Sequence, residues 1–79
     1  MTSVTYYVAQ PFEFTSAGRL VAGAPQQVQT ASEAVRRAEY MARKGGAIAF
    51  SRTGDLSSGD FDDAVILRSF GQVPEDVGT

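Results

Sequence analysis

Residues 30–52, TASEAVRRAEYMARKGGAIAFSR, decide the fold, because they predict one capped helix followed directly by one buried strand. Thr30 and Glu33 have the spacing of a capping box, in which the Thr30 hydroxyl accepts from the Glu33 N–H and the Glu33 carboxylate reaches back to the Thr30 N–H. Apolar residues then recur at helical spacing along one face. They are Ala31, Ala34, Val35, Ala38, Met41 and Ala42. We therefore expect an alanine-lined amphipathic helix over 31–44 that lies close to a sheet.

The opposite face of this helix is charged. Glu33 with Arg37, and Glu39 with Arg43, are spaced four apart in the favourable order, and each pair would contribute about 0.2–0.5 kcal/mol. The two glycines at 45–46 predict a left-handed residue that ends the helix.

Residues 47–52 are short, apolar and bounded by glycine, which favours a strand over more helix. We expect Ile48 and Phe50, its larger apolar residues, to face the core. Residues 64–70 predict a second, returning strand that stops at Gly71.

Residues 4–14 alternate with period two and predict a half-buried strand whose apolar side includes Val8 and Phe12. Gln10 and Pro11 predict a bulge or an unpaired side near its middle, since proline cannot donate to a ladder.

Residues 19–29 form a weaker strand pattern, interrupted by Gly23 and Pro25. Both residues are tolerated best at a sheet edge. The sequence therefore predicts an edge strand in two pieces.

The element order is β-β-α-β-β. We expect one α+β domain over residues 1–73, with a four-stranded, mainly antiparallel sheet, one helix packed on one face, and a disordered tail at 74–79. The preferred strand order is 2-1-3-4. The alternative makes the second and third strands parallel neighbours and needs a right-handed crossover. The expected core contains Val4 or Tyr6, Val8, Phe12, Ala34, Val35, Ala38, Met41, Ala42, Ile48, Phe50 and Ile66.

Composition narrows the function classes. The chain of 79 residues has no cysteine and no histidine and a net charge of −2. Disulfides and the usual zinc, haem and iron–sulfur ligands are therefore missing, and nucleophilic catalysis would need an uncommon Ser or Thr arrangement. No apolar run reaches membrane-span length, and no signal peptide is visible. We expect a cytoplasmic, non-enzymatic protein without a cofactor and without a membrane partner.

Three segments carry a resemblance: GAIAFSRTGD at 46–55, DAVIL at 63–67 and FGQVP at 70–74. With the preceding alanine-rich helix, they are similar to short hypothetical proteins of alphaproteobacteria that share an AFSRTGD…DDAVIL…FG.VP pattern. The resemblance covers roughly the C-terminal two thirds of the chain. It implies a small bacterial domain and assigns no activity, cofactor or site residue.

The first candidate site is the sheet face opposite the helix. Tyr7, Val65 and Leu67 are expected to form an exposed apolar patch there, of the kind that marks a protein interface. One helix cannot cover both apolar sides of the last strand, so we expect self-association, as in a homodimer, or a protein partner. The alternative is that other residues of the chain fold back over this face. They are Leu56, Phe61 and Val73.

The second candidate is a basic surface for nucleic acid. It comprises Arg36, Arg37, Arg43 and Lys44 of the helix, joined by Arg52. Such a patch would contact phosphates. The alternative is an ordinary solvated helix face whose bases match the helix dipole.

Two further patterns suggest binding or catalysis but are better explained as ordinary turns. The acidic loop with Asp55, Asp60, Asp62 and Asp63 offers oxygen ligands for Ca²⁺ or Mg²⁺, but it does not fit the EF-hand spacing and reads better as a turn. Residues 51–55, SRTGD, lack the companions of a catalytic or phosphate-binding motif, so a strand end and turn explain them. The leading expectation is therefore an interaction module, with nucleic-acid binding as the alternative.

Overall fold

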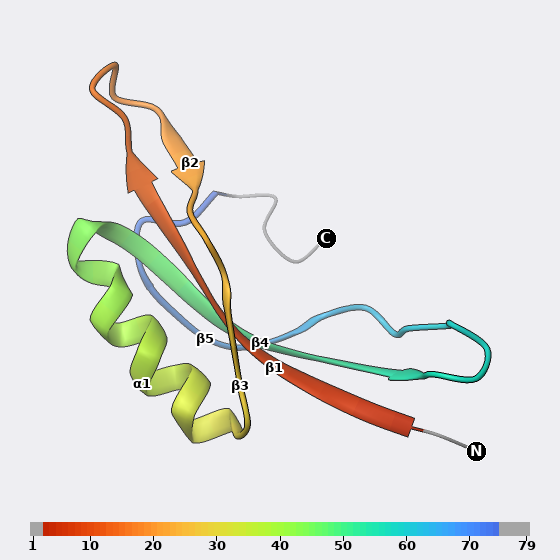
Figure 1. Cartoon of the computed structure of the whole chain (residues 1–79). Coiled ribbons are helices and arrows are strands. Elements are labelled where there is room, and N and C mark those ends of the chain that lie inside the picture. The colour runs from red at the N-terminus through yellow and green to blue at the C-terminus, as the bar shows by residue number, and fades with distance from the viewer. Residues whose placement is uncertain (1–2, 75–79) are drawn as a thin grey trace.

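A single antiparallel sheet with one helix against it forms the described part of the chain, residues 3–74, in the computed structural model (Figure 1). The predicted α+β fold is confirmed. The elements are β1 (Ser3–Phe14), β2 (Leu20–Ala22), β3 (Gln26–Val28), α1 (Ala31–Met41), a 3₁₀ turn (Ala42–Lys44), β4 (Gly45–Asp55) and β5 (Val65–Gly71). Of the predicted tail, only Pro74 lies within the described residues.

The ladder between β1 and β4 is the centre of the sheet. It runs without interruption from Ser3 opposite Asp55 to Glu13 opposite Gly45. β5 pairs with the other side of β4, and β2 and β3 both pair with the other side of β1. The predicted order is therefore confirmed, as is the edge strand in two pieces.

Pro11 explains where the edge breaks. β3 pairs with residues 7–9 and β2 with residues 12–14, which leaves Gln10 and Pro11 without a strand partner on that side. The Gln10 amide fills the gap by donating to the carbonyl oxygen of Gly23 at 2.8 Å, and the Gly23 N–H donates to the Pro11 carbonyl at 2.9 Å. Pro11, which has no N–H to donate, thus lies at the position where β1 has no neighbouring strand on that side.

The helix begins as predicted and ends differently. The Thr30 hydroxyl accepts from the Glu33 N–H at 3.1 Å. At the other end the α-helix stops at Met41 and tightens into the 3₁₀ turn. The prediction of a left-handed terminating glycine is wrong, because Gly45 has φ 159° and ψ −75°. Glycine is required there for space, since a Cβ would lie 2.6 Å from the Phe12 carbonyl oxygen.

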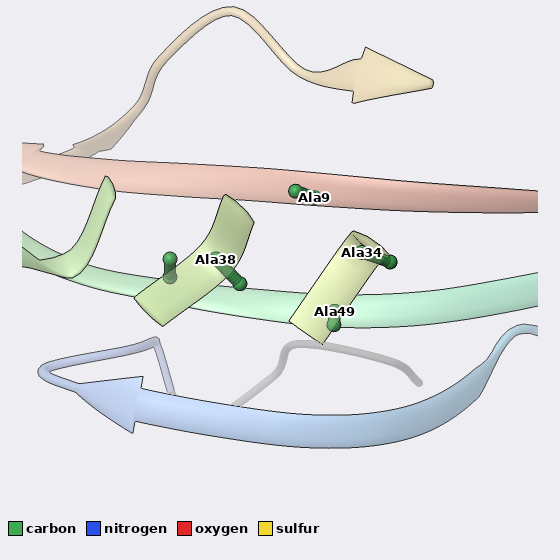
Figure 2. Packing of buried hydrophobic residues seen from close by; sticks show 5 residues of the cluster. Ala9, Ala34, Ala38 and Ala49 are labelled. Atoms are coloured by element: carbon green, nitrogen blue, oxygen red, sulfur yellow. The ribbon is translucent and has the colours of Figure 1, made fainter. Parts of the chain in front are cut away.

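The helix meets the sheet through alanines (Figure 2). Ala34 and Ala38 of α1 pack against Ala9 of β1 and against Ala47 and Ala49 of β4, and all five are fully buried. We call these five residues the alanine seam. Small side chains let the helix backbone approach the sheet closely, as the sequence predicted.

The predicted orientation of the strands is wrong, however. Ala9 lies opposite Ala49, and Val8 lies opposite Phe50. Because alternate residues point to opposite faces, and because the alanines lie under the helix, the larger residues Val8 and Phe50 point away from it. A helix that approaches closely leaves room only for small residues beneath it.

The expected core changes accordingly. Phe12 and Ile48 are buried as predicted, but on the face opposite the helix. Ile66 is 39% exposed, so its assignment to the core is wrong.

Candidate interaction surfaces

The sheet face without the helix carries the larger apolar side chains of β4 and several of those of β1. The register places Val8, Phe50 and Ile66 directly opposite one another on β1, β4 and β5. We call these three residues the apolar strip and this side of the sheet the helix-free face. Val8 and Phe50 are half-buried and Ile66 is exposed.

One end of the helix-free face is covered by Phe61. Its ring stacks on Tyr6 with centroids 5.9 Å apart and planes 19° apart, and it occupies the space beside Gly54. The Arg52 guanidinium lies 5.7 Å from the Phe61 centroid, and its Nε–H donates to the Asp62 carbonyl at 3.1 Å. Phe61 therefore folds back over this face, as the alternative interpretation proposed, whereas Leu56 is 52% exposed.

The other end is covered by the segment that follows β5. The main chain of Gln72 lies where a Gly46 side chain would project. Gly46 pairs with Phe12, so both face this side of the sheet. Val73 and Pro74 continue from Gln72 and are half-buried. The apolar strip lies between these two covered ends.

The residues predicted for the protein interface are distributed differently. Tyr7 and Leu67 pack against the alanine seam on the helix side of the sheet, so their expected placement on the free face is wrong. Val65 is 59% exposed, but it pairs with Ser51, which lies opposite Tyr7 and therefore shares the helix side of the sheet. The prediction placed the wrong side of β1 under the helix, and this error moved the expected interface residues to the wrong face of the sheet.

The basic residues of the helix and its 3₁₀ turn are exposed, and three of them have neighbours that were not predicted. Arg37 donates to the Gln26 side-chain oxygen at 2.9 Å, and the Arg43 guanidinium lies 4.9 Å from the Tyr40 centroid. Lys44 lies 3.9 Å from a Glu13 carboxylate oxygen. Within residues 3–74, neither Glu33 with Arg37 nor Glu39 with Arg43 is at ion-pair distance, so the two predicted pairs do not form.

Arg52 does not join this basic surface. It projects from the helix-free face beside Phe61. Tyr40, which the sequence analysis did not single out, lies among the helix cations and is 65% exposed. Its signal was its position, since it interrupts the charged side of the helix at spacing four from Arg36 and three from Arg37 and Arg43.

The acidic loop is organised by local hydrogen bonds. An Asp55 carboxylate oxygen accepts from the Ser57 N–H at 2.9 Å and from the Ser57 hydroxyl at 2.6 Å. Among the described residues, no three carboxylates come together in a group that could hold a metal ion. The loop also begins later than predicted, because β4 continues to Asp55 and pairs there with Ser3.

No protein-family model, curated protein or solved structure matches this chain. In the part of the chain that the structure describes, α1 is too short and too polar to cross a membrane, and it is the longest helix.

Proposed function

We propose that this protein is a non-enzymatic interaction module that associates with itself through the apolar strip. The observation that carries the proposal is the distribution of side-chain size. On the two central strands, alanines lie directly beneath the helix, with larger residues such as Tyr7 and Leu67 packed around them. Val8, Phe50 and Ile66 lie on the face that the helix does not cover. Large apolar groups left without a covering element are typical of an interface.

A second copy suits this surface for two reasons. The strip itself carries no charged residue, so its partner must present a neutral apolar surface, and a second strip meets that condition. A two-fold axis near Phe50 would also bring the same patch of both copies together, as closed dimers require. Two sheets would then pack face to face about 10 Å apart.

The amino-acid composition supports the proposal that the protein is not an enzyme. The chain contains neither histidine nor cysteine, and these residues supply most general bases and nucleophiles. The same composition suits the reducing conditions of a bacterial cytoplasm, where we propose that the protein works.

Solution mass tests the proposal. Sedimentation equilibrium of the wild-type chain should give a dimer whose mass falls to that of a monomer on dilution. Ile66→Lys should give a monomer throughout, because it puts a charge into the apolar contact. Val65→Lys is the matched control, since Val65 is also exposed on β5 but points to the other side of the sheet.

A wild-type chain that is monomeric at millimolar concentration contradicts the proposal. Equal effects of the two lysine variants would also contradict it, because self-association would then not use the apolar strip. Circular dichroism of each variant checks that the fold is kept.

A further inference from the structure

The arginines on the outer side of α1 and its 3₁₀ turn have neighbours other than carboxylates. Arg37 is held by a neutral amide, and Arg43 lies over an aromatic ring. Only Lys44 approaches an acid, at 3.9 Å and with 79% of its side chain exposed. A contact of that length and exposure contributes little. The result is a local positive surface on a chain whose net charge is −2.

Glu33 and Glu39 belong to the same helix and Glu13 lies beside Lys44, whereas the aspartates of the described chain lie elsewhere. Asp60, Asp62 and Asp63 belong to the loop between β4 and β5, which extends away from the helix to the opposite end of the molecule (Figure 1). The described residues span 46 Å along the longest axis. Exposed charges more than about 8 Å apart are largely screened at physiological salt, so aspartates in a loop that extends away from the helix offset little of the field of the helix cations.

The cations surround a hollow in the surface. A depression of about 460 Å³ lies between the C-terminal part of the helix, β1 and the segment that enters β3. Its charged lining comprises Arg37, Arg43 and Lys44 and one acid, Glu13. Pro11 and Met41 supply apolar surface, and Tyr40 supplies an exposed ring. A second depression of about 370 Å³ adjoins it across Arg37 and Tyr40 and is also lined by Arg36 and Glu33. We call the two depressions together the basic groove.

The chemistry of the basic groove has two parts. Guanidinium and ammonium groups bind phosphate oxygens. An exposed tyrosine flanked by arginine offers a flat surface on which a base can stack, and this stacking tolerates any base. The four cations that line the groove outweigh its two acids, Glu13 and Glu33, together with the partial negative charge of the helix C-terminus, about −0.5. The groove volume is also within the usual range for a small ligand, roughly 300–1,000 Å³.

We infer that the basic groove binds a nucleotide unit, with the base on Tyr40 and its phosphate between Arg37, Arg43 and Lys44. The unit comes either from a single-stranded nucleic acid or from a free nucleotide. Duplex DNA fits less well, because its bases are not available for stacking on a side chain. This inference does not depend on self-association, since the apolar strip lies on the other face of the sheet from the helix.

Fluorescence anisotropy with labelled oligo(dT) and oligo(U) of about ten nucleotides tests the inference. The affinity should fall with salt, with a slope of about 0.7 in the logarithmic plot for each phosphate contacted. Tyr40→Ala should weaken binding by about tenfold, whereas Tyr40→Phe should bind like the wild type, because the ring and not the hydroxyl does the stacking. Arg43→Gln should weaken binding and reduce the salt slope by about 0.7.

Arg68→Gln is the matched control. The Arg68 guanidinium lies 5.3 Å from the Phe70 centroid, so this variant removes the same charge from the same kind of ring contact on β5, away from the groove. It should bind oligonucleotides like the wild type, and so should Ile66→Lys. The substituted residues are all exposed in the wild-type structure. Phe70 is half-buried, and no variant changes it. Thermal unfolding confirms that each variant is folded.

Competition with unlabelled ligands shows whether the nucleotide unit comes from a free nucleotide or from a single-stranded nucleic acid. If a nucleoside monophosphate displaces the oligonucleotide at a similar concentration, the natural ligand is a free nucleotide. If only longer oligonucleotides compete, it is single-stranded nucleic acid. The inference is overturned by absence of binding at low salt, by equal competition from inorganic phosphate, or by equal losses in Arg43→Gln and Arg68→Gln.

Discussion

The main chain of Gln72 occupies the position at which a side chain of Gly46 would begin. The Gln72 N–H also donates to the Gly45 carbonyl at 3.0 Å, which fixes the segment after β5 against the start of β4. This contact brings the half-buried Val73 and Pro74 towards the helix-free face, on which Phe12 and Ile48 are buried.

Gly46→Ala should therefore destabilise the protein. The added methyl group overlaps backbone rather than a flexible side chain, so one of the two segments has to move, and we expect a loss of about 1–3 kcal/mol. Gly23→Ala is the control, since its methyl group would meet a proline ring carbon at 3.1 Å and require a smaller shift. Urea unfolding measures both. Equal losses would show that the Gln72 contact is not responsible.

Phe61→Ala should cost about 1–3 kcal/mol of unfolding free energy, because it removes the ring that stacks on Tyr6 and covers Gly54. Phe14→Ala removes the same ring from a position that is 52% exposed and should cost less. Thermal unfolding of both variants checks the difference. A more stable Phe61→Ala variant would mean that the loop ring does not shield the sheet.

Ala38→Leu should destabilise the protein by about 1–3 kcal/mol, since the alanine seam has no space for a branched side chain. Ala17→Leu, in the exposed turn between β1 and β2, should change stability little. Chemical denaturation of the two variants provides the comparison. Wild-type stability in Ala38→Leu would show that the helix can move away from the sheet at no cost.

Thr30→Ala should lower stability by about 1 kcal/mol through loss of the helix cap. Thr30→Ser keeps a hydroxyl and should lose much less, and Ser32→Ala, in the exposed first turn, should be nearly neutral. Thermal melts followed at the helical circular dichroism band measure the effect. A loss in Thr30→Ser as large as that in Thr30→Ala would argue against the capping hydrogen bond.

The local sequence signals predicted the elements well. The Thr30 cap, the alanine face of the helix, the broken edge beside Pro11 and the antiparallel order are all present. Each depends on neighbours in sequence or on a simple rule of connection, so each can be derived without knowing the packing.

The orientation of the strands could not be derived in the same way. In β1 and β4 both parities carry apolar residues, and the usual rule assigns the larger ones to the covered core. Here the alanines Ala9 and Ala49 lie under the helix, because the separation between the helix and the sheet sets the permitted side-chain size. The predicted interface residues Tyr7 and Leu67 were misplaced for this reason. Tyr40 was missed because hydrophobic periodicity does not show which exposed residues border a hollow.

The alanine seam has a further thermodynamic consequence. Alanine has no side-chain rotamers to lose, so the close contact of α1 with β1 and β4 forms without the conformational entropy cost that leucine or methionine would incur there. Each contact in the seam is weak, but almost none of its attraction is offset by the ordering of side chains.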